Sequence, residues 1–136
     1  MSAAVATGMK LELVPVPVTD VDRAKAFYAD RLGFVVDVDV RPAPGVRVVQ
    51  LTPPGSACSI GLGEGLGAYE GVPGSVRALH LVVPDIEAAR AELLGRGVEV
   101  GPVSDVGGGV RYASLVDPDG NTLVLQEMAW RTGDAF

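Results

Sequence analysis

The chain has 136 residues, of which 48% are hydrophobic and 21% charged, so it has room for one domain with one core and is too apolar to remain disordered. A formal charge of -6 and a pI near 4.6 exclude the dense cationic surface by which proteins bind nucleic acid. No apolar run approaches the roughly 20 residues that span a bilayer, and residues 1–8 lack the pattern of a signal peptide, so we expect a cytoplasmic protein without a membrane partner.

The first predicted unit covers about residues 10–62. An apolar strand over residues 13–18 precedes an amphipathic helix, which Thr19 or Asp20 caps and Gly33 ends. The helix spaces its apolar side chains as a stripe that packs on a sheet: Val21, Ala24, Phe27 and Tyr28. Strands over residues 46–51 and 56–62 then flank a turn, Thr52-Pro53-Pro54-Gly55.

The second unit, about residues 76–127, repeats the first after a glycine-rich linker at about residues 63–75. It has a strand over residues 78–83, a capping Asp85 and a helix that Gly97 ends. Strands over residues 110–116 and 121–127 flank a turn, Asp117-Pro118-Asp119-Gly120. Residues 128–136 form a tail. The sequence therefore predicts one α+β domain built from two tandem β-α-β-β-β modules.

Two motifs in this framework carry a family resemblance. The first helix opens on Asp20-Val21-Asp22-Arg23-Ala24-Lys25-Ala26-Phe27-Tyr28, and the late turn is Asp117-Pro118-Asp119-Gly120-Asn121. Together with the tandem modules, they resemble the vicinal oxygen chelate superfamily of glyoxalases, bleomycin resistance proteins and ring-cleaving dioxygenases, over about residues 10–127. The resemblance implies a cup-shaped mixed sheet, with a divalent metal ion on the floor of the cup in the enzymes.

The positions at which such enzymes hold the metal ion carry unsuitable side chains here. Counting seven residues back from each helix Asp, and four on from each turn Gly, gives Leu13, Ala78, Ser59 and Val124. Only Ser59 offers an oxygen, and it is a poor neutral ligand. His80, Gln126 and Gln50 share the same face by strand parity, but amides bind transition metals weakly, and Glu12 and Glu127 should face away. We therefore expect neither a metal ion nor another cofactor.

The cup face is instead predicted as a mostly apolar pocket with a few polar groups, as small-molecule sites are. His80, the only histidine, is the candidate catalytic residue, as a general base, hydrogen-bond partner or stacking surface; a histidine satisfied by backbone or water is the alternative. Core packing would give the same pattern at any one position of the pocket. The predicted ligand-pocket residues are Leu13, Val48, Gln50, Ser59, Ala78, His80, Tyr112, Ser114, Val124, Gln126 and Trp130.

Three functions are compatible with this pattern. The leading hypothesis is a metal-independent protein of the glyoxalase/bleomycin resistance type that binds and sequesters a small molecule, planar or cationic in view of the acidic chain. The alternative is an enzyme, a lyase, isomerase or dioxygenase with a non-standard metal site or a metal-free mechanism that uses His80. A structural or regulatory module is the third. The family resemblance also implies a homodimer, with modules paired within one chain or between two.

Overall fold

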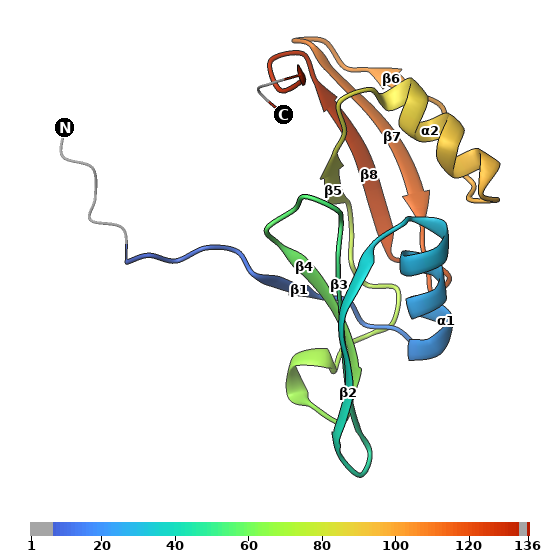
Figure 1. The fold of residues 1–136 in the computed structure, drawn as a ribbon. Helices are drawn as coiled ribbons and strands as arrows, with labels where there is room; N and C mark the ends of the chain where they lie inside the picture. Colours follow the sequence, from blue (N-terminus) through green and yellow to red (C-terminus); the bar gives the residue numbers. More distant parts are fainter. Residues whose placement is uncertain (1–6, 134–135) are drawn as a thin grey trace.

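Two four-stranded sheets, one from each half of the chain, form the framework of the protein (Figure 1). The computed structural model describes residues 7–133 and residue 136. The first sheet has the strand order β1-β4-β3-β2, with β1 Leu13–Pro15, β2 Val35–Ala43, β3 Val46–Thr52 and β4 Ser59–Glu64. The second has the order β5-β8-β7-β6, with β5 Leu79–Val82, β6 Ser104–Asp105, β7 Val110–Val116 and β8 Thr122–Met128. The predicted α+β class and tandem module pattern are confirmed.

The helices begin where the sequence predicts and end differently. Asp20, rather than Thr19, caps α1 (Val21–Ala26) by accepting from the Arg23 amide at 3.1 Å, and Asp85 caps α2 (Ile86–Gly95) in the same way. α1 continues into a wide π turn, η1 (Phe27–Arg31), before Gly33 reverses the chain; a 3-10 turn, η2 (Gly67–Tyr69), follows β4. No helix in the described part of the chain is long and apolar enough to cross a membrane.

Strand alternation gives each sheet a buried face and an open one. In β3, Val49 and Leu51 are fully buried on the helix side, and in β8, Leu123 and Leu125 are buried likewise. Glu127 also lies on the helix side, as predicted, where its carboxylate accepts from the Ile86 amide at 3.0 Å. The opposite face of each sheet, turned away from the helices, is called the cup face below. The predicted strand over residues 13–18 ends early, because Pro17 has no N–H to continue the ladder.

A buried polar cluster joins the two modules. The Tyr28 hydroxyl, on η1, donates to the Asp117 carboxylate at 2.9 Å, and the Asn121 side chain donates to the same carboxylate at 2.7 Å. Backbone amides of Asp119 and Asn121 donate to its other oxygen. Burial raises the pKa of Tyr28 well above its ordinary value, and the Asp117 charge adds to this, so the phenol remains a proton donor. The turn motif of module two is thereby fixed to the helix of module one.

Two arginines form a reciprocal clasp beside this cluster. Arg31 Nη1 donates to the Arg96 carbonyl at 2.7 Å, and Arg96 Nη1 donates to the Arg31 carbonyl at 3.2 Å. The residues are 65 positions apart, which is the spacing of the internal repeat, so each is the other's equivalent. Each guanidinium also lies over the glycine that ends the other helix, Gly97 or Gly33. The modules therefore meet through the reciprocal contacts of an isologous interface.

Substitution of Gly97 tests this clasp. Gly97 has φ +79, and a Cβ there would lie 2.5 Å from Arg31 Nη1. We expect Gly97→Ala to lower the free energy of unfolding by about 1–2 kcal/mol, measured by urea denaturation. Gly95→Ala is the matched control, because Gly95 is helical with nothing within 4 Å of its Cβ position, and it should be neutral or stabilising. Equal effects of the two substitutions would contradict the clasp.

Arg47 and Arg111 occupy corresponding places in the two modules and form ion pairs that support the sheets. Arg47 is only 6% exposed and forms a forked ion pair with Asp39, at 3.1 Å for each contact, and a further pair with Asp22 at 2.6 Å. Arg111 makes the corresponding fork with Glu127. Both arginines therefore bind carboxylates, and Arg47 is buried beside Asp22 of α1.

The Asp39 ion pair predicts an acid-sensitive fold. Hydrogen bonds from Arg47 and Lys25 hold the pKa of Asp39 well below its usual range. The unfolded chain therefore binds more protons in acid, and the stabilisation present above about pH 4 is lost as the pH falls further. We expect Asp39→Asn to flatten the decrease of the urea midpoint below about pH 4. Asp30→Asn is the control, because no ion pair of Asp30 occurs within the described residues; an unchanged slope in Asp39→Asn would refute the prediction.

Candidate functional site

The first sheet brings four of the predicted pocket residues to its cup face. Leu13 and Ser59 are register neighbours on β1 and β4, so the two metal-equivalent positions of this module are adjacent. Gln50 and Val48 lie on β3 opposite Gly61 and Gly63 of β4. All four side chains are half-buried. Gln50 lies on the cup face, as its place in the alternating strand predicts, because the neighbouring Val49 and Leu51 point into the core.

The second sheet brings six more together. On its cup face His80, Val124 and Ser114 are successive cross-strand neighbours on β5, β8 and β7, and Tyr112 pairs with Gln126 in the next row. Ala78 immediately precedes β5. Trp130, in contrast, lies beyond the end of β8 beside Gly109 and is 61% exposed, so the structure does not bring it to the other pocket residues. No periodic pattern governs the tail, and its position could not be inferred from strand spacing.

His80 is held in one orientation by its own backbone surroundings. Its Nδ1 lies 2.6 Å from the Ala78 carbonyl, which can only accept, so Nδ1 carries the hydrogen and Nε2 of the neutral ring is an acceptor. Ala78 itself has φ +56, a conformation that non-glycine residues seldom adopt, and its amide donates to the Thr122 hydroxyl at 2.6 Å. The ring meets Tyr112 edge-on at 5.7 Å. A strained backbone therefore positions an imidazole whose Nε2 remains available.

A cavity of about 560 Å³ opens on the cup face of the second sheet. Three predicted residues, Ala78, Ser114 and Val124, line it. The remaining lining comes from the same module and is mostly apolar, with Glu99 and Thr122 as its polar members: Glu99, Val100, Gly101, Leu115, Val116 and Thr122. Its volume lies within the range of small-molecule sites. The predicted residues of the first module do not line this cavity, and His80, Tyr112 and Gln126 of the second module do not line it either.

Tyr69 covers part of the first sheet's cup face, and strand periodicity did not reveal it. A Cβ at Gly61 would lie 2.9 Å from the Tyr69 ring, and one at Gly63 would lie 2.5 Å from it. Tyr69 thus rests directly on a strip of β4 that only glycine leaves open. Tyr69 lies in η2, within the segment that the sequence predicts as a linker. The signal available in the sequence was the alternation of Gly61 and Gly63, which marks a close approach by another group.

A small group of polar side chains lies on the same face. The Thr52 hydroxyl forms hydrogen bonds with the Asp37 carboxylate and, at 2.6 Å, with the Ser59 hydroxyl. Asp37 is exposed and lies at a register shift of β2 between Val36 and Val38. The alternation of apolar and polar residues does not reveal the bulge. Its extra residue reverses the face of the sheet on which the following side chains of β2 lie. The bulge places the Asp37 carboxylate beside Thr52 on the cup face of module one.

The residues present do not fit the metal ion of the family's enzymes. At the four equivalent positions, the side chains of Leu13, Ala78 and Val124 offer no ligand atom, and the Ser59 hydroxyl is bound to Thr52. His80 has one free ring nitrogen, and its row neighbours are Val124 and Ser114. No group of three His, Cys, Asp or Glu side chains with metal-site geometry occurs in residues 7–133. No step of a mechanism is therefore assigned to a metal ion.

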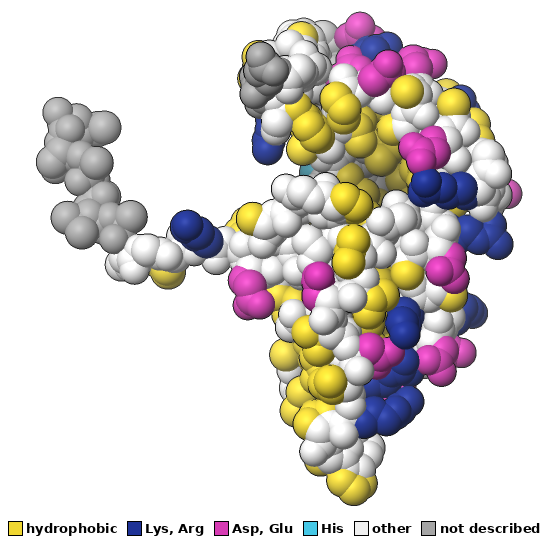
Figure 2. Space-filling model, viewed as in Figure 1, with side chains coloured by type: hydrophobic (Ala, Val, Ile, Leu, Met, Phe, Trp, Pro, Cys, Tyr) yellow, Lys and Arg dark blue, Asp and Glu magenta, His cyan; other side chains and the backbone are white. Residues whose placement is uncertain are grey.

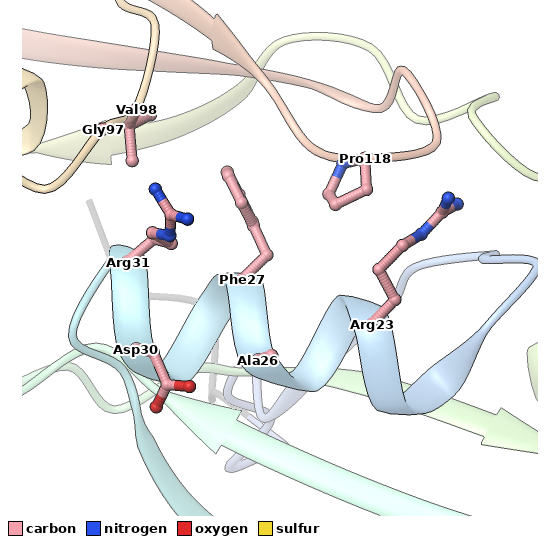
Figure 3. Close-up of a pocket in the computed structure, with 8 residues that line it drawn as sticks. All are labelled: Arg23, Ala26, Phe27, Asp30, Arg31, Gly97, Val98 and Pro118. Carbon is pink, nitrogen blue, oxygen red and sulfur yellow. The ribbon is translucent and has the colours of Figure 1, made fainter.

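Two further cavities lie on the helix side, between the modules. One, of about 460 Å³, lies between α1 with η1 and the loops of module two. Figure 3 shows Arg23, Phe27 and Arg31 directed from successive turns toward Gly97, Val98 and Pro118, with Asp30 pointing away. The other, of about 320 Å³, lies beside α2 and is mostly apolar. Neither was predicted from the sequence, because both depend on how the modules pack.

The comparisons with known proteins agree with the fold. The family described as Glyoxalase/Bleomycin resistance protein/Dioxygenase superfamily matches residues 10–125. TnmS3, an antibiotic binding protein from Streptomyces sp. CB03234, is 34% identical with a TM-score of 0.77, and the match covers 89% of this chain and 97% of TnmS3. A superfamily member from Sphaerobacter thermophilus DSM 20745 is 31% identical with a TM-score of 0.76, covering 88% and 97%. No curated protein matches.

Proposed function

The chain belongs to the Glyoxalase/Bleomycin resistance protein/Dioxygenase superfamily, and we propose that it binds and sequesters a small organic molecule on its cup face without a metal ion. The observation that carries this proposal is the cavity over Ala78, Ser114 and Val124, where two of the positions expected to hold metal ligands instead form an apolar wall. The similarity to an antibiotic binding protein over nearly its whole length supports an antibiotic as the class of guest.

The guest is proposed to be planar and cationic. Aromatic rings border the cup faces, with Tyr69 on the first sheet and Tyr112 beside His80 on the second. Asp37 and Glu99 supply carboxylates at these faces, and the chain as a whole has a formal charge of -6. A cation is attracted by this field and can also lie over an aromatic face. His80 lies beside the cavity, next to Val124 in its lining, so its Nε2 atom can accept a hydrogen bond from a guest that extends toward β5.

A homodimer is proposed to complete the pocket. The cavity on the second sheet is lined by module two alone, while the cup residues of module one lie elsewhere in the same chain. β1 and β5 are the edge strands of their sheets, and residues 7–12 lead away from the body of the molecule (Figure 1), with Met9 83% and Leu11 78% exposed. Exposed edges and apolar side chains of this kind favour pairing with a second copy.

Calorimetric titration with a panel of planar cationic and planar neutral antibiotics tests the proposal. We expect one-to-one binding per protomer that persists after dialysis against EDTA, with the cationic members binding more tightly at low salt. Sedimentation of the same protein is expected to give the mass of a dimer, and Leu11→Asp to shift it toward the monomer. Absence of binding across the panel, or binding that EDTA abolishes, would overturn the metal-free proposal.

A metal-free enzyme is the second candidate, and the His80 geometry favours it. With Nδ1 held by the Ala78 carbonyl, Nε2 is positioned to take a proton from a bound substrate. The test is product formation from compounds that the titration identifies, followed by mass spectrometry. Turnover that His80→Ala removes while binding persists would establish catalysis. Unchanged compounds after prolonged incubation would leave binding as the function.

A further inference from the structure

The two helix-side cavities are counterparts in the internal repeat. The first is lined by residues of α1 and η1 together with Gly97, Val98 and Pro118, as Figure 3 shows. The second is lined by residues of α2 together with Gly33, Phe34 and Pro53. Each cavity thus lies between one module's helix and the glycine that ends the other helix. They flank the arginine clasp on its two sides.

The two copies differ in what fills the space beneath the helix. In module one, Phe27 and Tyr28 meet edge-on at 5.3 Å, and Tyr28 is fully buried against Phe34. At the repeat spacing of 65 residues, the equivalents in α2 are Glu92 and Leu93. Neither carries a ring. The first cavity, although larger at about 460 Å³, is lined by no strand residue, whereas the second reaches leucines of the second sheet, where module two lacks these rings.

The second cavity, of about 320 Å³, lies under α2. Its floor is formed by Leu81, Leu115 and Leu125 on the helix side of the second sheet, and Leu115 and Leu125 are each 3% exposed. Phe34 forms one wall. Glu92 and Arg96, which form an ion pair, are the charged residues in the lining. Figure 2 shows hydrophobic side chains gathered in a hollow between the two halves of the molecule.

We propose that this hollow, which we call the α2 pocket, binds a small aromatic molecule whose ring takes the place that an aromatic side chain takes in module one. The leucine floor matches the ring faces, Phe34 offers an edge-to-face contact, and the Glu92 carboxylate can accept from a ring N–H or O–H. His80 does not line the α2 pocket, which lies on the helix side of the sheet. The α2 pocket is therefore a second site, independent of the cup.

Indole is a suitable probe, because it combines a planar apolar ring with one N–H donor. We expect indole to bind the full-length protein, measured by calorimetry and by chemical shift changes of the leucine methyl groups. Leu93→Phe restores a ring at the position of Tyr28 and should weaken indole binding at least about tenfold. Leu94→Phe is the matched control on the solvent side of α2, where Leu94 is 43% exposed, and it should change the affinity by less than about twofold. His80→Ala should also leave the affinity for indole unchanged.

A second filling variant and a crystal soak locate the bound indole independently of Leu93→Phe. Ala89→Leu narrows the same pocket from a different position and replaces Leu93→Phe should that variant not fold. A crystal soaked with 5-bromoindole should show its bromine signal above Leu115 and Leu125. Indole affinity that survives both filling variants, or bromine located only on the cup face, would overturn the proposal. Loss of binding in His80→Ala would do so as well, since it would place indole in the cup.

Discussion

Ser114→Trp is expected to lower the affinity for a cup-bound guest at least about 100-fold, which corresponds to about 2.7 kcal/mol. Ser114 is exposed on the cup face, lies beside Val124 across the β7 and β8 ladder, and lines the cavity of about 560 Å³. An indole side chain there would occupy the space over Ala78 and Val124 that the guest requires. The measurement is calorimetric titration with the antibiotic that binds the unaltered protein most tightly.

The matched control is Val106→Trp. Val106 is 56% exposed and lies outside the cavity, so the same large side chain is added without filling the pocket. Its affinity for the guest should equal that of the unaltered protein, and both variants should retain the same thermal midpoint within a few degrees. Retained binding in Ser114→Trp, in a protein that is folded, would remove the second sheet's cup face as the binding site.

Asp117→Ala is expected to lower the free energy of unfolding by about 3 kcal/mol or more, the largest stability effect that the structure predicts. Asp117 is 3% exposed, and its carboxylate accepts from Tyr28, from the Asn121 side chain and from two backbone amides. Removing it leaves these buried donors without an acceptor, and water reaches few of them. Urea denaturation at neutral pH measures the effect.

Tyr28→Phe separates the hydrogen bond from the packing of the ring. It removes one donor and retains the ring that contacts Phe27 and Phe34, so the expected loss is about 1 kcal/mol. A loss in Asp117→Ala no larger than in Tyr28→Phe would show that the turn does not depend on this carboxylate.

Much of the framework could be predicted because its signals are local. Asp20 and Asp85 cap helices through contacts three residues away, and strand alternation separates Val49 and Leu51 from Gln50 without knowledge of the rest of the chain. The motifs that carry the family resemblance, at residues 20–28 and 117–121, consist of such local signals. One lies in each module, so the resemblance covers most of the chain. Boundaries were less certain, as the short β1 and the wide η1 turn show.

The arrangement of side chains on the cup faces could not be predicted from the spacing of residues along the chain. Tyr69 reaches Gly61 and Gly63 from a segment without periodicity, and Asp37 reaches Thr52 because a bulge shifts the register of β2. The strain at Ala78, which holds His80 in one orientation, depends on a hydrogen bond to Thr122, 44 positions later in the chain. Such contacts form only when distant segments meet, so neither composition nor parity indicates them.

Repeat spacing and residue chemistry are local properties. They were therefore enough to predict a duplicated α+β module, with Leu13, Ser59, Ala78 and Val124 at the positions where metal ligands are expected. The tertiary structure decided how the copies meet. The arginine clasp pairs residues related by the repeat, yet of the two helix-side cavities only the one beside α2 reaches the sheet, where Glu92 and Leu93 take the places of Phe27 and Tyr28. Packing of the modules, which brings Phe34 and Pro53 to α2, decides where this cavity lies.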